Sequence, residues 1–193
     1  MSLTSSTLHR HYYDWSGLLN TLNAAGIRMM TYINPYLANN VASLKKNYRR
    51  FVWGVGLHCL LSAEIRPGVG CCASARNLFL EAAEKGYLVK NSTGQPYILY
   101  SATKTFSFGT IDVTNPEAVE WFGQVIRCNM LYDRTAHCPN GSAIPSNATI
   151  GVGGWMSDFG EYLPFDSSVA VGDAATVHNQ FVDVWSRHLF TWG

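Results

Sequence analysis

Apolar residues recur at helical spacing in four stretches of the chain, and each stretch is bounded by residues that start or stop helices. Glycine follows the first two stretches, proline lies just before the third, and an aspartate precedes the fourth. Glycine favours a helix end because it adopts left-handed backbone angles, whereas Asp or Asn caps a helix start. The pattern predicts helices over 15–25, 78–85 and 117–130, and a last helix that begins after Asp173.

Two apolar runs lack helical spacing and predict short buried strands, one over 27–33 and one over 150–156. The first run ends at Asn34-Pro35, where proline has no N–H to donate to a strand ladder. A helix, a glycine and a buried strand in succession form the αβ half of a barrel unit. The chain is therefore expected to belong to the α/β class.

The middle of the chain predicts a β-hairpin. Residues 87–89 and 96–100 flank a turn of Asn, Ser, Thr and Gly, and 105–113 is expected to continue extended. Asp112 begins the string Asp-Val-Thr-Asn-Pro, in which Thr or Asn caps the next helix. Anchoring of the loop backbone is the role predicted for Asp112, in preference to substrate contact.

Two carboxylates follow the second buried strand, Asp158 directly after Ser157 and Glu161 three residues later. In a parallel barrel the carboxyl ends of strands carry the catalytic groups, and paired carboxylates are the usual chemistry for cleaving a glycosidic bond. Spacing alone also allows another interpretation, because Asp followed three residues on by Glu is a helix-start signature. The spacing alone does not decide between these two interpretations.

Length, charge and composition restrict the classes of function that the chain can have. At 193 residues the chain is shorter than a whole (β/α)8 barrel, which needs roughly 250. A net charge of +1 with 14% charged residues argues against a nucleic-acid partner. No apolar run reaches the length of a membrane span, and the N-terminus lacks the profile of a signal peptide, so neither a membrane partner nor a compartment is assigned.

The cysteines are five in number and show no paired CxxC spacing. This pattern supports neither a zinc site nor a disulfide framework, and buried or incidental thiols are predicted instead. The five are Cys59, Cys71, Cys72, Cys128 and Cys138.

A resemblance to a known family adds to this reading. Residues 153–164, GGWMSDFGEYLP, resemble the nucleophile strand of glycoside hydrolase family 31, whose usual form is Trp-x-Asp-Met-Asn-Glu. The variant Asp-Phe-Gly-Glu-Tyr-Leu-Pro is similar to the sulfoquinovosidase branch rather than to the common α-glucosidases. The run AAGIRMMTYINPYLANN is similar to the preceding strand of the family. In all, the resemblance covers about 12–40, 76–130 and 150–190.

The resemblance implies a partial (β/α)8 TIM barrel over 1–193 and a retaining α-glycosidase without cofactor or metal, acting on an α-glycoside or sulfoglycoside. Asp158 would be the nucleophile and Glu161 a supporting carboxylate, while Trp155 and Asn34 would bind substrate. For Asn34, which precedes Pro35, a structural role in the turn is the alternative. His178 matches a histidine of the branch, and a structural role is predicted for it.

The family's proton donor is an Asp on a later strand, which would follow this chain, so an incomplete enzyme that is inactive in isolation is expected. The alternative is a non-catalytic carbohydrate-binding or regulatory relative. Two stretches, about 41–75 and 131–149, do not match the family pattern and are predicted to be insertions.

Overall fold

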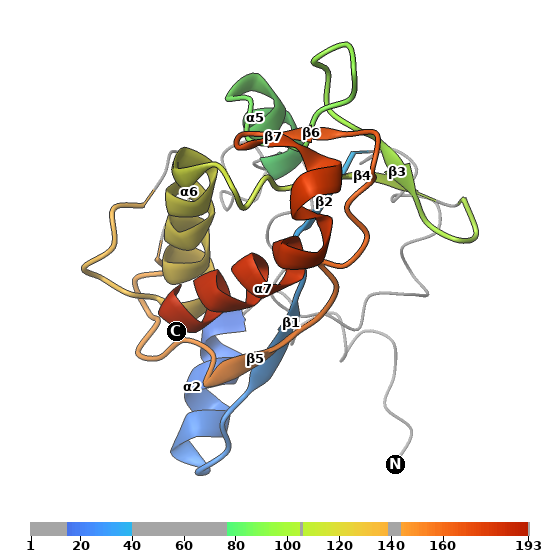
Figure 1. The fold of residues 1–193 in the computed structure, drawn as a ribbon. Coiled ribbons are helices and arrows are strands. Elements are labelled where there is room, and N and C mark those ends of the chain that lie inside the picture. The colour runs from blue at the N-terminus through green and yellow to red at the C-terminus, as the bar shows by residue number, and fades with distance from the viewer. Residues whose placement is uncertain (1–14, 40–76, 105, 139–143, 193) are drawn as a thin grey trace, which may run out of the picture.

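A computed structural model describes residues 15–39, 77–104, 106–138 and 144–192 of the chain (Figure 1). Short strands in groups of two or three lie between the helices along these ranges. In chain order the elements are α2 (Trp15–Ala24), β1 (Met30–Ile33), β2 (Tyr36–Ala38), α5 (Leu78–Glu84), β3 (Leu99–Tyr100), β4 (Ser107–Thr110), α6 (Pro116–Ile126), the π-helix η2 (Arg127–Leu131), β5 (Gly154–Ser157), β6 (Ser168–Val169), β7 (Gly172–Asp173) and α7 (Ala174–Trp192).

The four predicted helices are confirmed, and their ends carry the expected signals. Gly26 and Gly86 follow α2 and α5 with φ of 75° and 73°, the left-handed conformation that ends a helix. Asn115 caps α6 by accepting a hydrogen bond from the Glu117 amide, and Asp173 accepts one from Ala175 at the start of α7. The third helix widens into η2 after Ile126, so its last turn is a π-helix.

Strands β1 and β5 form a parallel pair and lie side by side (Figure 1). The register places Met30 opposite Gly154 and Ile33 opposite Ser157. The predicted strands are present, but the prediction that they are buried holds for one face only: Thr31 and Ile33 are buried, whereas Met30 is 61% and Met156 57% exposed. Among the described residues, β1 and β5 pair only with each other. Met30 and Met156 lie on the same face of this pair, and that face is exposed at both residues. The described part therefore contains no closed barrel.

A second, antiparallel sheet has the strand order β2-β4-β3. The predicted turn is present, since Asn91 Oδ1 accepts hydrogen bonds from the backbone amides of Thr93 and Gln95. The two segments also pair across the turn as predicted: the Tyr97 amide donates to the Val89 carbonyl at 2.8 Å, and Lys90 forms an antiparallel bridge with Pro96. In addition, Leu88 forms an antiparallel bridge with Ile111, and β3 pairs with β4.

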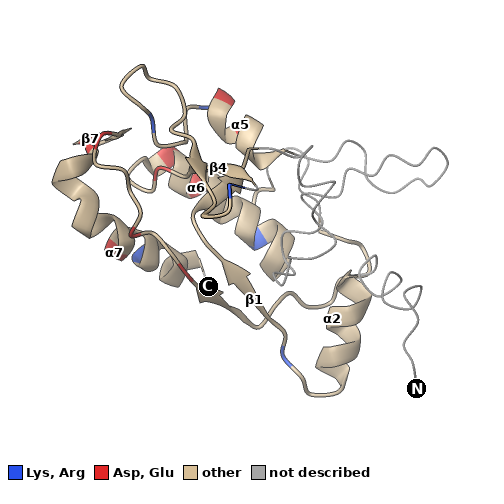
Figure 2. Cartoon of the chain, turned by 90° about the vertical axis from the view of Figure 1, so that its right-hand side faces the viewer, with Lys and Arg blue, Asp and Glu red and all other residues tan. Residues whose placement is uncertain are grey.

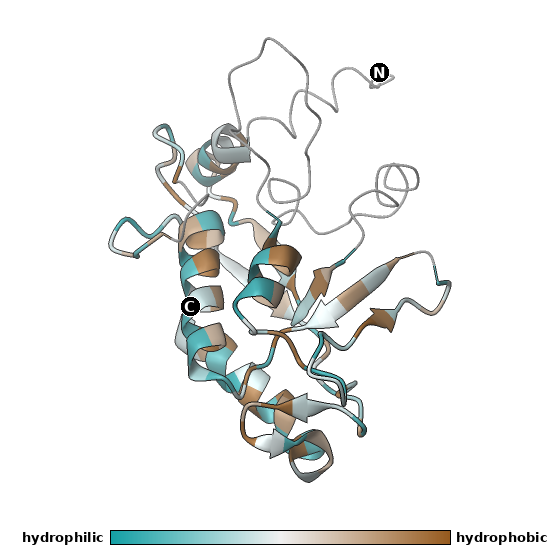
Figure 3. Cartoon of the chain, turned by 90° about the horizontal axis from the view of Figure 1, so that it is seen from above, coloured by the Kyte–Doolittle hydropathy of each residue, from teal (hydrophilic) through white to brown (hydrophobic). Residues whose placement is uncertain are grey.

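The core lies between the sheets and the two long helices α6 and α7. Figure 3 shows that the helices carry hydrophobic residues on one side and hydrophilic residues on the other. The ring of Phe122 on α6 lies 6.3 Å from Trp185 and 5.8 Å from Trp192, both on α7. Trp185 and Phe181 are almost wholly buried, so this aromatic contact joins the two helices.

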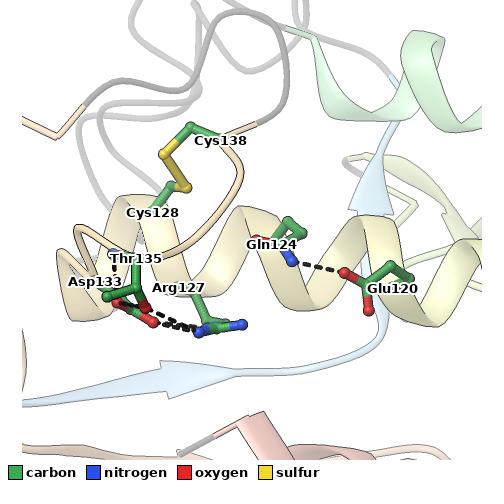
Figure 4. A network of polar contacts seen from close by, with 7 residues as sticks. All are labelled: Glu120, Gln124, Arg127, Cys128, Asp133, Thr135 and Cys138. Carbon is green, nitrogen blue, oxygen red and sulfur yellow. Dashed lines mark hydrogen bonds and ion pairs between the residues drawn. A yellow bond between two sulfur atoms is a disulfide. The ribbon is translucent and has the colours of Figure 1, made fainter.

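A disulfide joins Cys128 to Cys138, whose Cα atoms are 5.7 Å apart (Figure 4). The prediction that no cysteine is paired was therefore wrong, and Cys59, Cys71 and Cys72 lie outside the described residues. The two cysteines meet because Tyr132 ends η2 in the left-handed conformation, with φ of 54°, and turns the chain back. Spacing along the sequence carries no sign of this reversal.

The same turn holds an ion pair between Arg127 and Asp133, with Arg127 Nε 2.8 Å from Asp133 Oδ2 (Figure 4). Thr135 donates to the other carboxylate oxygen from its hydroxyl, at 2.7 Å, and from its amide, at 2.9 Å. These hydrogen bonds, with that of Arg127, lower the pKa of Asp133 from 3.8 to about 2.

The predicted insertion at 131–149 is bound to the rest of the fold where it is described. Its second half lies against α2: Ser16 donates to Asn147 Oδ1 at 2.9 Å, and Thr149 donates to Asn20 Oδ1. The prediction of an insertion at 41–75 falls outside the described residues.

Charged side chains are sparse in the described ranges, and Figure 2 shows Lys and Arg scattered singly over several elements. Within these ranges no helix combines the length and the hydropathy that crossing a bilayer requires.

Candidate functional site

Asp158 lies at the carboxyl end of the parallel pair. Its amide donates to the Ile33 carbonyl at 3.1 Å, which extends the ladder one residue beyond β5. Because side chains alternate along strands, Tyr32 and Asn34 of one segment share a face with Met156 and Asp158 of the other. The Asp158 side chain is exposed. No helix begins at residues 158–164, so the helix-capping interpretation of Asp158 was wrong.

Two donors contact the Asp158 carboxylate. The hydroxyl of Tyr32 donates to Oδ2 at 2.7 Å, and the amide of Phe159 lies 3.0 Å from Oδ1. The Asn34 side chain hydrogen-bonds the Tyr32 hydroxyl, and its own Oδ1 accepts from the Tyr36 amide at 3.0 Å. Residues from β1, from the turn before β2 and from the end of β5 thus form one polar network.

The tyrosines of this network keep their protons at neutral pH. Burial, followed by the hydrogen bond to Asp158, raises the pKa of Tyr32 from 10.0 to about 12. Burial also raises the pKa of Tyr36, with the negative charge of Glu161 as the next cause. The negative charge of Glu161 also raises the pKa of Tyr32, as the last of its causes, and Tyr32 remains a hydrogen-bond donor towards Asp158.

The backbone turns sharply after Asp158. Phe159 has φ of 62° and Gly160 has φ of 109°, so two successive residues lie in the left-handed region. A side chain other than glycine is uncommon there and costs about 1–3 kcal/mol. Gly160 lies against α7: a Cβ at this position would stand 3.1 Å from Trp185 Cδ1. The turn that presents Asp158 is therefore seated on a buried helix face.

The segment after the turn is fixed by α7 as well. His178 donates from Nδ1 to the Leu163 carbonyl at 2.6 Å and stacks on Phe165, with ring centroids 4.0 Å apart. The predicted structural role of His178 is confirmed.

Asp112 anchors backbone, as predicted. It is 4% exposed, and its Oδ1 accepts from the Thr114 amide at 3.0 Å. Its Oδ2 accepts from the Ala170 amide at 2.6 Å, a link across 58 residues that the sequence does not indicate. Asp112 thereby ties the loop before α6 to the β6–β7 turn.

The structure does not bring Trp155 to Asp158. Alternation along β5 places Trp155 on the opposite face, where it is partly buried against the core. Sequence reasoning missed Tyr32, although its spacing of two from Asn34 gives both residues the same face. Once the parallel register is known, that spacing is sufficient to find it.

The surroundings of Asp158 are open. Two hollows in the described part, of about 290 Å³ and 350 Å³, lie beside α5 and between α6 and α7, away from this residue. Nor do the described ranges contain a group of three or more His, Cys, Asp or Glu placed to hold a metal ion.

Comparison with known proteins gives one consistent family. The family described as "Glycosyl hydrolases family 31 TIM-barrel domain" matches residues 3–190. A sulfoquinovosidase of Escherichia coli is 30% identical over 178 residues, which are 92% of this chain and 18% of the relative. One of Agrobacterium fabrum is 28% identical over 180 residues, with 90% and 22% covered. This chain thus spans about a fifth of the length of these relatives.

Solved structures agree with the sequence match. A family 31 sulfoquinovosidase from E. rectale, in complex with an aza-sugar inhibitor, superposes with a TM-score of 0.59 at 28% identity, over 91% of this chain and 18% of that one. A Flavobacterium johnsoniae dextranase superposes with a TM-score of 0.57 at 16% identity, over 93% and 17%, which supports the fold alone. The chain belongs to glycoside hydrolase family 31, as a part of its TIM-barrel domain.

Proposed function

We propose that this chain contributes the nucleophile strand of a retaining α-glycosidase, with Asp158 as the nucleophile. The carboxylate attacks the anomeric carbon, the bond from that carbon to the leaving oxygen breaks, and a covalent glycosyl-enzyme forms. A separate acid about 5 Å away protonates the leaving oxygen and later activates water, which releases the sugar and frees Asp158. We assign that acid to a residue outside this chain.

The observation that carries the proposal is the placement of Asp158. Its carboxylate is exposed at the carboxyl end of a parallel strand pair, the position that catalytic groups occupy in barrels of this type. An exposed carboxylate with hydrogen-bond donors but no ion pair in the described contacts is able to meet a ligand. The Asp-Phe-Gly-Glu string that surrounds it supports the same role.

Glu161 is proposed as a supporting carboxylate and Asn34 as a residue of the substrate cleft. Asn34 shares the Asp158 face and contacts the same network through Tyr32. We leave Trp155 out of the cleft because it lies on the opposite face. The proposed substrate is a sulfonated α-glycoside, since sulfoquinovosidases are 28–30% identical to the chain.

The test separates attack by Asp158 from the proton-donor step. A dinitrophenyl 2-deoxy-2-fluoro-α-glycoside carries a leaving group that departs without protonation, so the first step needs only the nucleophile. Incubation with the chain should add the mass of one fluorosugar, and peptide mapping should locate it at Asp158. Asp158→Asn should abolish the adduct.

Asp173→Asn is the matched control, because Asp173 is also exposed and also accepts a backbone hydrogen bond. It should label like the natural chain. An adduct at another residue, or none on a chain with native circular dichroism, would refute the proposal. Saturable sugar binding without an adduct would instead favour a non-catalytic carbohydrate-binding relative.

A further inference from the structure

Asp158 is held by a residue that lies far away in the sequence. The carboxylate stands one residue past the end of β5, where the chain turns away through Phe159 and Gly160. Its own segment contacts it through the Phe159 amide, at 3.0 Å. The Tyr32 hydroxyl, 126 residues away in the sequence and 2.7 Å away in space, ties it to β1.

We infer that Tyr32 is a positioning residue that fixes the rotation of the Asp158 carboxylate at the end of the β1–β5 pair. The contact itself is independent of any reaction. Its consequence for catalysis rests on the proposed function.

The torsion between Cβ and the carboxylate of an aspartate is a broad, two-fold one, so an uncontacted carboxylate rotates freely. Donors on both oxygens remove that freedom: Tyr32 binds Oδ2 and the Phe159 amide binds Oδ1. A nucleophile held close to its attack geometry reacts faster because the orientational entropy is already lost. Loss of the Tyr32 hydroxyl therefore acts on the reaction step more than on sugar binding.

The donor is itself well placed. Tyr32 shares a strand face with Asp158, and side chains on strands lean along the strand direction, which brings the phenol to the strand end. Asn34 hydrogen-bonds the phenol oxygen and is in turn fixed by the Tyr36 amide at 3.0 Å. Since the hydroxyl of Tyr32 keeps its proton at neutral pH, it donates throughout the working range.

The first experiment measures labelling rates with the dinitrophenyl 2-deoxy-2-fluoro-α-glycoside at several concentrations. Tyr32→Phe keeps the ring and removes the hydroxyl. We expect the maximal labelling rate to fall about ten- to a hundredfold, with little change in the concentration that gives half the maximal rate. A residue that only supports the fold would not produce this split.

Tyr97→Phe is the matched control. Tyr97 also donates to an aspartate, with its hydroxyl 2.9 Å from Asp166 Oδ1, but that pair lies outside the network described above. Its labelling rate should equal that of the natural chain. Equal maximal rates for Tyr32→Phe and the natural chain would overturn the inference.

The second experiment needs no sugar. With tyrosine labelled by 13C at Cζ, the Tyr32 resonance is identified as the one lost in Tyr32→Phe. Asp158→Asn should move that resonance at neutral pH, because the charged acceptor is replaced by a neutral amide. Glu161→Gln, which leaves the hydrogen bond intact, should move it less.

A Tyr32 resonance that does not respond to Asp158→Asn would overturn the inference, whatever the labelling shows. If the natural chain forms no adduct, the proposed function fails, and the resonance alone decides whether Tyr32 positions Asp158. The two hypotheses therefore fail in different ways.

Discussion

Replacement of Gly160 by alanine tests how the turn beside Asp158 is built. At φ of 109° an alanine is strained in its backbone, which destabilises the fold by about 1–3 kcal/mol. Its Cβ would also stand 3.1 Å from Trp185 Cδ1 and 3.3 Å from Val182 Cα. Trp185 is fully buried and cannot move aside, so overpacking adds about 1–3 kcal/mol. We expect a total destabilisation of about 2–6 kcal/mol.

Gly94→Ala separates the two contributions. Gly94 has φ of 79°, and nothing lies within 4 Å of a Cβ placed there, so its substitution carries strain alone, about 1–2 kcal/mol. Urea unfolding followed by tryptophan fluorescence gives both free energies of unfolding by linear extrapolation. The overpacking contribution exceeds about 0.5 kcal/mol. If the losses of unfolding free energy in Gly160→Ala and Gly94→Ala agree within that value, the turn does not pack closely against α7 and the reasoning is refuted.

Three further predictions concern regions away from Asp158. Reduction of the disulfide, which spans 10 residues, should lower the free energy of unfolding by about 3 kcal/mol, and Cys138→Ser should lower it by a similar amount in urea unfolding. Asp133, with a folded pKa of about 2 set first by hydrogen bonds from Thr135, adds stability above pH 4 that is lost as the pH falls towards 2. Asp133→Asn should therefore flatten the acid limb of stability against pH, and an unchanged limb would contradict the assignment. Asp112→Ala removes the buried carboxylate that accepts from the Ala170 amide and should cost about 1–3 kcal/mol in urea unfolding, whereas a cost well below about 1 kcal/mol would show that water replaces the carboxylate.

The helices could be predicted from the sequence because their signals are local. Gly26, Gly86 and the Asn115-Pro116 start each act within a few residues of the helix end that they define. The position of Asp158 after a strand was also accessible, since an apolar run and the acidic residue that follows it are adjacent.

What the sequence did not reveal depends on pairings between distant segments. The face of Trp155 follows from the register of β5 against β1, and no residue near Trp155 encodes that register. The Cys128–Cys138 bond depends on the reversal at Tyr132, a non-glycine residue in the left-handed conformation. The strands β6 and β7 have two residues each, which is too short for an alternation of apolar and polar residues to be recognised in the sequence.

The separation of 126 residues between Tyr32 and Asp158 has a consequence for how the protein folds. Contacts between such distant segments raise the contact order and form slowly, because the entropy of closing a long loop is lost before the contacts that offset it have formed. A ribosome must synthesise most of the chain before the phenol and the carboxylate can meet. The hydrogen bond between Tyr32 and Asp158 is therefore expected to form in a late step of folding.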